Sequence, residues 1–249
     1  MLRSFLLAVQ FLTRIPVRLS DVREDELGRA SAYFPLIGTA IGAVAAVIFW
    51  AVHHVLPAST SIILILVFMT IITNALHEDG LADALDGFGG GWTKDKALSI
   101  MKDSRIGSFG ALGLIFLVIS KYNLMGLIEP NHLWRWLLFA PTAARWSTLP
   151  LCLTLDYARD EGQGKAVARK IPDFAVIFGT LTLFAASAAA GLYGALLGLA
   201  ASAGVIVVTG LYYRHRVGGV TGDCLGATNQ LVEVAVYLSA VLLTAKGGM

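Results

Sequence analysis

Long apolar stretches alternate with short polar connections along most of this chain. About 20 apolar residues in a helix are enough to cross the roughly 30 Å hydrocarbon core of a bilayer. Stretches that meet or approach this length predict transmembrane helices at Tyr33–Leu56, Ser59–Leu76, Ser108–Ile128, Leu133–Leu155, Asp173–Gly191, Gly194–Tyr213 and Gln230–Ala245. The pattern therefore predicts an all-α, polytopic membrane bundle of about seven transmembrane helices, with residues 1–249 forming one membrane-embedded domain.

The first 20 residues, MLRSFLLAVQFLTRIPVRLS, combine a basic residue with a short apolar run. A signal peptide begins in the same way, but Gln10, Arg14 and Arg18 interrupt this run and no small-residue cleavage pattern follows. The segment is better explained as an amphipathic helix that lies at the membrane interface.

Composition supports the membrane assignment and excludes other classes. Hydrophobic residues make up 56% of the chain and charged residues 14%, against roughly 25% charged residues in soluble domains. The net charge of +2 is too small to indicate nucleic-acid binding. Cys152 lies in an apolar run and Cys224 in a glycine-rich segment, so neither a disulfide framework nor a zinc site is indicated.

The positions of the basic residues predict the orientation, because cytoplasmic loops retain an excess of Lys and Arg. Seven crossings place the amino terminus and the connections after the second, fourth and sixth spans on one side of the membrane. In chain order, these four segments contain Arg3, Arg14, Arg18, Arg23 and Arg29; Lys94, Lys96, Lys102 and Arg105; Arg159, Lys165, Arg169 and Lys170; and Arg214 and Arg216. The three other connections contain neither Lys nor Arg. We therefore expect the amino terminus to be cytoplasmic and the carboxyl terminus external.

The stretch HEDGLADALDGFGGG carries the clearest candidate chemistry. Asp79, Asp83 and Asp86 are spaced i, i+4 and i+7, which places them on one face of a helix. Three neighbouring carboxylates repel one another unless a divalent cation lies between them, and such hard oxygen ligands suit Mg²⁺ or Mn²⁺. The spacing predicts a metal site for phosphate chemistry, and a solvated amphipathic helix is the alternative.

Glycines follow the acidic residues directly at positions 87 and 89–91, and we expect a loop whose bare backbone approaches phosphate. His77 stands at the end of a predicted span, where an interfacial or hydrogen-bonding role is more common than a catalytic one.

The next polar block, KDSRIGSFG, precedes the third predicted span. Lys102 and Arg105 are suited to gripping phosphate oxygens, although their place on the positive side explains them equally well. That explanation does not cover Asp103 or Ser104, and Ser104 is also suited to capping the helix that follows.

The block RHRVGGVTGDCLGATNQLVE, before the last predicted span, surrounds Thr221 and Asp223 with glycines. We expect a loop that allows close approach of a ligand, with a plain turn as the alternative. With the predicted orientation, Asp223 lies on the same side of the membrane as the two blocks above.

Charged residues inside predicted spans are functional candidates, because a central Arg or Lys costs at least ~2.5 kcal/mol there. Arg145 lies near the middle of the fourth span and requires a partner, either a carboxylate or a substrate anion. Lys121 is expected to extend outward to the interface. Glu233 is close enough to the cytoplasmic end of its span to join the site.

The three blocks HEDGLADALDGFGGG, KDSRIGSFG and GGVTGDCLGA together resemble the cobalamin synthase family, the adenosylcobinamide-GDP ribazoletransferases. The segments FLTRIPV and YFPLIG near the amino terminus are also similar to that family. The resemblance implies a magnesium-dependent enzyme of the bacterial cytoplasmic membrane. Such an enzyme joins α-ribazole or its 5′-phosphate to adenosylcobinamide-GDP and releases GMP.

Roles for individual residues follow from the resemblance. It implies metal binding by Asp79, Asp83 and Asp86, and a further metal-ligand or general-base role for Asp103 and Asp223. Candidates for contacts to substrate phosphates are Lys102, Arg105, Ser104, Arg14, Arg145 and Thr221. The expected partners are the two substrates and the lipid bilayer, with no nucleic acid, and a homo-oligomer is compatible with the sequence.

Three other functions share parts of this pattern. The segment Asp83-Ala-Leu-Asp86-Gly87 fits the start of the CDP-alcohol phosphotransferase motif, but glycines occupy positions 90 and 91 where that motif has Ala and Arg. A membrane prenyltransferase would need a second aspartate-rich motif, and the segment 156–172 has its acids at other spacings. A transporter tends to place ionisable groups at the bilayer midplane, whereas here they cluster at one surface.

Overall fold

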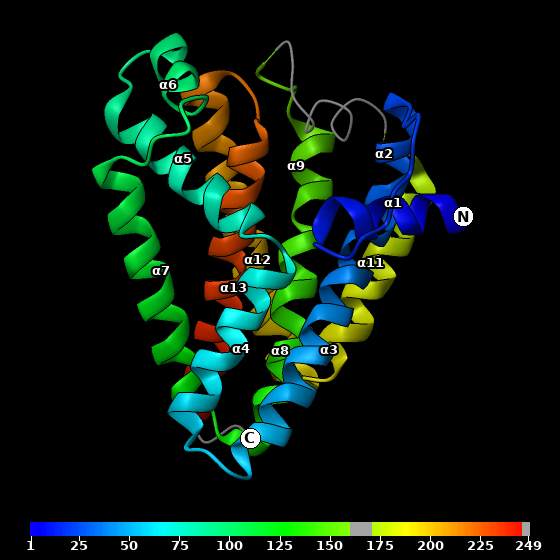
Figure 1. The fold of residues 1–249 in the computed structure, drawn as a ribbon, viewed down its shortest axis with the longest axis vertical. Helices are drawn as coiled ribbons and strands as arrows, with labels where there is room; N and C mark the ends of the chain where they lie inside the picture. The colour runs from blue at the N-terminus through cyan, green and yellow to red at the C-terminus, as the bar shows by residue number, and fades with distance from the viewer. Residues whose placement is uncertain (160–170, 246–249) are drawn as a thin grey trace.

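The structure is a computed structural model that describes residues 1–159 and 171–245 (Figure 1). Within these ranges the regular secondary structure is helical, apart from one isolated parallel bridge between Tyr157 and Val220. The elements are α1 (Leu2–Leu12), α2 (Glu24–Ala30), the short 3-10 helix η1 (Ser31–Tyr33), α3 (Phe34–His53), α4 (Ala58–Ile72), α5 (Leu76–Gly90), α6 (Lys94–Ile100), α7 (Ser108–Gly126), α8 (Pro130–Trp146), α9 (Thr148–Thr154), α11 (Asp173–Ala188), α12 (Gly191–Val217) and α13 (Gly222–Ala245).

The predicted all-α membrane bundle is confirmed, but the count of seven spans is not. In the described residues, four helical segments are long and apolar enough to cross a membrane by themselves: Glu26–His53, Ser108–Gly126, Gly191–Val217 and Gly222–Thr244. The helices α4 and α5 make a fifth only if they are taken as one span, and they are bent by 84°. The two remaining predicted stretches form α8 with α9, and α11, which has 16 residues.

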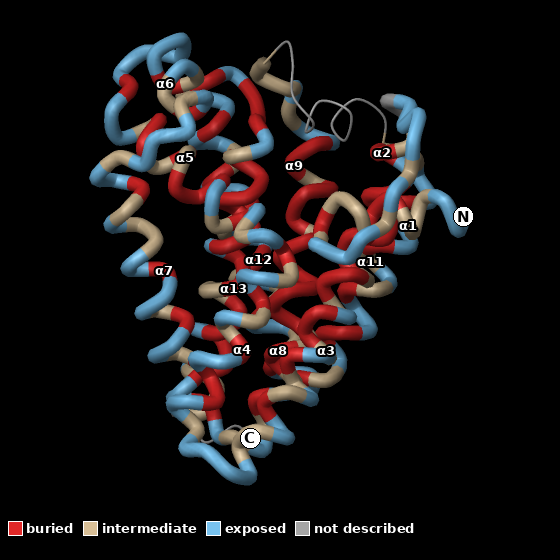
Figure 2. The backbone as a smooth tube through the Cα atoms, in the orientation of Figure 1, coloured by how far each residue is buried: buried red, intermediate tan, exposed pale blue. Residues whose placement is uncertain are grey.

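Helix α13 forms the centre of the bundle. It packs against α5, α7, α8 and α12, and 67% of its membrane-length segment is buried, against 22% for α7. Figure 2 shows buried backbone concentrated in the middle of the bundle and exposed backbone along α7 at its outer side. The outward side chains of α7 are apolar, Phe116 and Ile119 among them, as contact with lipid requires.

The chain turns sharply between α4 and α5. Asn74 and Ala75 both adopt left-handed backbone conformations, with φ of 55° and 54°. Helix α5 therefore lies across the upper end of the bundle in Figure 1 instead of continuing along α4. The backbone N–H of Arg14, just after α1, donates to the Ile72 carbonyl at the end of α4, at 2.8 Å. The acidic face of α5 is thus held at the same end as α1.

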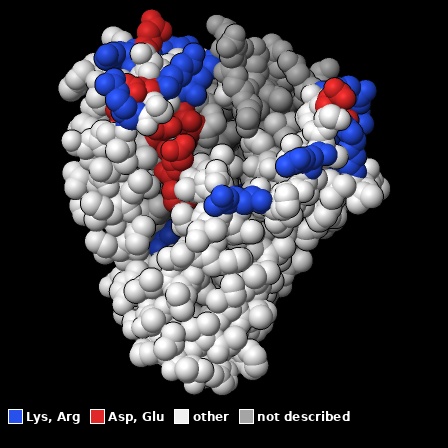
Figure 3. All heavy atoms as spheres, viewed as in Figure 1, with Lys and Arg blue, Asp and Glu red and all other residues white. Residues whose placement is uncertain are grey.

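The polar connections are divided between the two ends of the bundle. The amino-terminal segment, the α5–α7 connection, the end of α9 and the α12–α13 connection all lie at the upper end in Figure 1, and the carboxyl terminus lies at the lower end. Figure 3 shows Lys, Arg, Asp and Glu gathered at the upper end of the visible face, while its lower end is almost uncharged. Lys165, Arg169 and Lys170 lie outside the described residues. Which end faces the cytoplasm stays a prediction.

Two segments expected to be glycine-rich loops are helical. Helix α5 continues to Gly90, and α13 begins at Gly222, eight residues before the predicted start of the last span. Packing explains the glycine at position 87 of α5, because Gly87 lies against the side chain of Met101, which follows α6. The amino-terminal helix forms as predicted, and α1 buries Leu7 and Leu12. Its position at the membrane interface stays a prediction.

Candidate active site

The acidic residues of α5 lie on the predicted helix, but they differ in their surroundings. Asp79 is exposed, Asp83 is partly buried, and Asp86 is buried with 9% of its surface exposed. Asp79 and Asp83 are one helical turn apart, so their side chains point from the same face. These two aspartates are therefore the members of the predicted trio best placed to meet a ligand.

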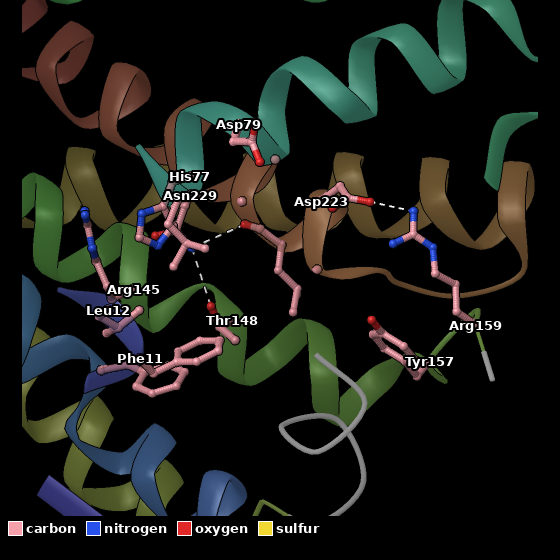
Figure 4. A pocket seen from close by; sticks show the side chains of 16 residues that line it. Phe11, Leu12, His77, Asp79, Arg145, Thr148, Tyr157, Arg159, Asp223 and Asn229 are labelled. Atoms are coloured by element: carbon pink, nitrogen blue, oxygen red, sulfur yellow. Dashed lines mark hydrogen bonds and ion pairs between the residues drawn. The ribbon is translucent and has the colours of Figure 1, made fainter. Parts of the chain in front are cut away.

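Close backbone contact between α5 and α13 adds Asp223 to this group. The Cα of Gly80 lies so near Gly226 that a Cβ on Gly226 would be 3.2 Å from it, and a Cβ on Gly80 would be 3.2 Å from the Asp223 Cα. A Cβ at either position would be tighter than an ordinary contact, so glycine at both positions favours this close approach. The aspartates of α5 therefore lie near the first turn of α13, close enough for the charges of Asp79 and Asp223 to act on Asp83, while Figure 4 shows the Asp223 carboxylate directed at Arg159.

The pKa of Asp83 reflects the crowding of negative charge in this cluster. Partial burial raises its pKa, and the nearby charges of Asp79, Asp223 and Asp86 raise it further, to about 7. The positive charge of Arg159 acts in the opposite direction. Because the carboxylates destabilise one another's charged forms, a bound cation would stabilise the cluster.

Asp86 serves as a clamp between α5 and α7. Its carboxylate accepts hydrogen bonds from the backbone N–H of Gly107, at 2.6 Å, and of Gly110, at 2.8 Å. Both donors belong to the start of α7, where backbone N–H groups lack partners within the helix. The expectation that Ser104 caps this helix is wrong, because α7 begins four residues later and Asp86 supplies the acceptor.

A third metal ligand is not evident in the described part of the chain. Both oxygens of Asp86 already accept hydrogen bonds, and no three His, Cys, Asp or Glu side chains among the described residues are grouped to hold an ion. Metal binding by Asp79, Asp83 and Asp86 therefore stays a prediction.

Arg159 is a site residue that the sequence interpretation missed. Its Nη2 donates to the Asp223 carboxylate at 2.6 Å. The segment before it is held by two backbone hydrogen bonds, from Ala158 to the Val220 carbonyl and from Val220 to the Asp156 carbonyl. Gly219 permits this contact, since a Cβ there would lie 2.1 Å from the Asp156 oxygen. Arg159 had been counted only as part of the positive side.

A cavity of about 230 Å³ runs from this acidic cluster into the bundle (Figure 4). Asp79, Asp223, Arg159 and Tyr157 line one part of it. The rest is lined by Phe11, Leu12, Phe34, Leu76, His77, Gly80, Arg145, Thr148, Gly222, Leu225, Gly226 and Asn229. Side chains of α1, α3, α5, α8, α9 and α13 thus meet around one space, although they are far apart in the sequence.

Arg145 has the carboxylate partner that its position required. Its Nη1 and the Nζ of Lys121 both donate to Glu233, and Lys121 also donates to Gln230. Arg145 is 3% exposed and Lys121 5% exposed, so the expectation that Lys121 extends outward is wrong. A charged amine inside the bundle is tolerated because a carboxylate and an amide oxygen accept hydrogen bonds from it.

The block after α6 lies apart from the cavity lining. Arg105 donates to Asp103 through Nε at 3.0 Å and Nη2 at 2.6 Å, and this guanidinium lowers the pKa of Asp103 to about 2. Lys102, Ser104 and Arg105 are exposed. Asp103 is therefore a weaker proton acceptor than an ordinary aspartate.

Two other phosphate candidates occupy different places. The Arg14 side chain is exposed just beyond the cavity residues Phe11 and Leu12. Thr221 is fully buried, and its Oγ1 accepts a hydrogen bond from the Cys224 N–H at 3.2 Å, as a helix-capping threonine does. Contacts of either residue to a substrate stay predictions.

Together, the fold and the site define a multi-pass membrane protein with an acidic and arginine-containing cavity at one end of its bundle. A model of the family described as cobalamin-5-phosphate synthase matches residues 4–241, and the chain belongs to that family. It is therefore an enzyme of cobalamin synthesis, and the resemblance found in its motifs is confirmed.

Several relatives carry the name adenosylcobinamide-GDP ribazoletransferase. One from Shewanella sp. (strain W3-18-1) is 37% identical over 96% of this chain and 94% of its own length. The relative from Shewanella oneidensis is 38% identical over 98% of this chain and 94% of its own length. The relative from Shewanella baltica (strain OS185) is also 38% identical, over 94% of this chain and 91% of its own length. No solved structure gives a significant match to the chain.

Proposed function

We propose that this protein catalyses the reaction for which its relatives are named. It transfers the cobinamide-phosphate part of adenosylcobinamide-GDP to α-ribazole, or to the 5′-phosphate of α-ribazole, and releases GMP. The observation that carries the proposal is the meeting of Asp79, Asp83 and Asp223 with Arg159 at the end of a cavity in a membrane bundle. Acidic groups and an arginine beside an accessible space are the components that phosphoryl transfer uses.

The acidic cluster fits a magnesium ion by its chemistry. Asp79 and Asp83 offer hard oxygen donors from one face of α5, and Mg²⁺ usually takes one or two carboxylates and shares its other positions with substrate phosphates; the raised pKa of Asp83 is consistent with negative charge that a cation would offset. These residues would hold the ion, with Mn²⁺ as a possible substitute. When bound, such a cation offsets negative charge on a pyrophosphate.

Asp223 is the proposed proton acceptor. In the reaction, the 3′-oxygen of the ribazole forms a bond to the phosphorus that carries cobinamide, and the bond from that phosphorus to the GMP oxygen breaks. The hydroxyl proton goes to the acceptor. Asp223 lines the cavity, whereas Asp103 lies apart from the cavity lining and has a lowered pKa. Arg159 keeps Asp223 in place and presents positive charge beside it.

The exposed cations at the same end of the molecule are the proposed contacts for the outer phosphates and the large corrinoid. Lys102, Arg105 and Arg14 are exposed and could contact a bulky substrate that does not enter the cavity, Arg105 while it is paired with Asp103. We place this end on the cytoplasmic side of the bacterial inner membrane, because the basic segments gather there.

The test uses purified protein in detergent or liposomes, supplied with adenosylcobinamide-GDP and α-ribazole. We expect equal amounts of GMP and of a corrinoid with a completed nucleotide loop. EDTA should abolish both products, and excess Mg²⁺ should restore them. GMP release without α-ribazole would indicate hydrolysis instead of transfer, and full turnover in EDTA would contradict the metal assignment.

A further inference from the structure

The part of the cavity that lies away from the acidic cluster contains polar atoms with no partner. His77 is 5% exposed and Asn229 2% exposed, and both line the cavity. Neither Nδ1 of His77 nor Oδ1 of Asn229 has a hydrogen-bond partner among the described residues. Buried polar atoms are almost always paired, so these atoms mark a place in the cavity where a polar group of a ligand, or water, binds.

The orientation of Asn229 is fixed by the protein. Its Nδ2 donates to Thr148 Oγ1, at 3.4 Å, and to the Leu225 carbonyl, at 3.3 Å. With both contacts made through nitrogen, the Oδ1 atom remains as the free acceptor. Figure 4 shows His77 and Asn229 beside one another, at the opposite end of the cavity from Asp223 and Arg159.

The walls around these two residues are apolar and flat. Phe11 and Leu12 from α1, and Phe34 from α3, line this space, and the Phe11 and Phe34 rings stack with their centroids 5.5 Å apart. A volume of about 230 Å³ is below the range of roughly 300–1,000 Å³ that encloses a drug-sized ligand. This volume is that of the whole cavity, acidic part included, so the cavity is too small for a corrinoid, and the inner part suits one ring system.

We propose that this inner space, formed by Phe11, Leu12, Phe34, His77 and Asn229, is the subsite for the aromatic base of the acceptor nucleoside. The proposal rests on the proposed function, which supplies α-ribazole as the acceptor. Its base is a dimethylbenzimidazole, a flat and mostly apolar bicyclic ring with one free nitrogen that only accepts hydrogen bonds. His77 donates to that nitrogen from Nδ1, and Asn229 Oδ1 accepts from a hydroxyl of the ribose.

Charge and hydrogen bonding favour this occupant over other parts of the substrates. Guanine has several donors and acceptors on its edges, and phenylalanine and leucine walls would leave most of them unpaired. A phosphate in this space is less favoured, because the charge of Arg145 is already paired with that of Glu233, although its Nε has no hydrogen-bond partner among the described residues. The ribose then extends from the inner space toward Asp223, where the 3′-hydroxyl reacts.

The first test compares His77→Leu with the unsubstituted protein in the GMP-release assay. We expect the KM for α-ribazole to rise by about 10-fold or more, as for loss of one buried hydrogen bond, while the KM for adenosylcobinamide-GDP is unchanged. His77→Asn should recover most of the loss, since its amide N–H can occupy the position of Nδ1, whereas His77→Gln should recover less. His132→Leu, at the far end of α8, is the matched control.

The second test replaces the acceptor and so does not depend on how a variant folds. An analogue of α-ribazole with C–H in place of the free ring nitrogen should react with a KM about 10-fold higher in the unsubstituted protein. His77→Leu should use both acceptors equally. If His77→Leu still discriminates between them, the subsite assignment is wrong while the proposed function stands. If the unsubstituted protein forms no corrinoid product, the proposed function itself fails.

Discussion

The two hydrogen bonds of Asp86 lead to a prediction that separates a structural role from metal binding. Hydrogen bonds to a charged group contribute about 1.5–3 kcal/mol each. Asp86→Asn retains one acceptor oxygen but turns an NH₂ group toward either Gly107 or Gly110, so about one such bond is lost. We expect the start of α7 to be less stable by about 1.5–3 kcal/mol in this variant.

Hydrogen exchange measures this effect directly. If α7 opens locally before exchange, a loss of 1.5–3 kcal/mol accelerates exchange of the Gly107 and Gly110 amides by about 10- to 150-fold. Exchange would be followed by mass spectrometry on peptides that cover residues 105–112. Asp83→Asn is the matched control, because it makes the same Asp-to-Asn change on α5 at a residue that accepts no hydrogen bond from Gly107 or Gly110.

The same variants are then titrated with Mg²⁺ in the GMP-release assay. If Asp86 only holds α5 against α7, Asp86→Asn should need no more Mg²⁺ than the unsubstituted protein for half-maximal activity. Asp83→Asn should need more. Unchanged exchange at α7 together with a raised Mg²⁺ requirement in Asp86→Asn would refute the clamp and support the three-aspartate site predicted from the sequence.

Three further predictions concern the bundle and the site. Glu233→Gln should destabilise the bundle by about 3–5 kcal/mol, because it leaves two buried cations without a carboxylate, and this would be measured as loss of folded protein on heating in detergent. An unchanged midpoint would contradict it. Gly226→Ala should separate α5 from α13 and lower turnover. Gly204→Ala is the control and should not lower turnover, because a Cβ at Gly204 meets nothing within 4 Å. Equal activities of the two variants would show that the close approach is not required. Asp223→Asn should reduce kcat by about 100-fold or more, as loss of a general base does, whereas Asp103→Asn should reduce it by less than 10-fold. A larger loss of kcat in Asp103→Asn than in Asp223→Asn would identify Asp103 as the proton acceptor.

Protonation gives Asp103 a distinct pH dependence. Its pKa of about 2 lies below the ordinary value, so the ion pair with Arg105 is complete above about pH 4 and is lost only as the pH falls toward 2. Asp103 therefore does not account for any change in activity between pH 5 and 8. A pH profile of Asp103→Asn should match that of the unsubstituted protein in this range.

The sequence determined the fold class, the face of α5 and the family. Apolar stretches of membrane length can only be helices in lipid, because each backbone group must be paired within its own segment. The spacing of Asp79 and Asp83 then follows from the helical period alone. The family followed from the combination of three motifs, which a local reading of the chain can detect.

Only the tertiary structure decided which residues share the site. Arg159 reaches Asp223 because a backbone bridge joins loops about 60 residues apart, and His77 and Asn229 line one cavity from two different helices. Neither pair leaves a local pattern, because the contacts depend on how closely the helices approach. Asp86 had the spacing of a ligand, yet the amides of α7 occupy its oxygens. Periodicity fixes the direction of a side chain, whereas packing between distant segments decides what that side chain meets.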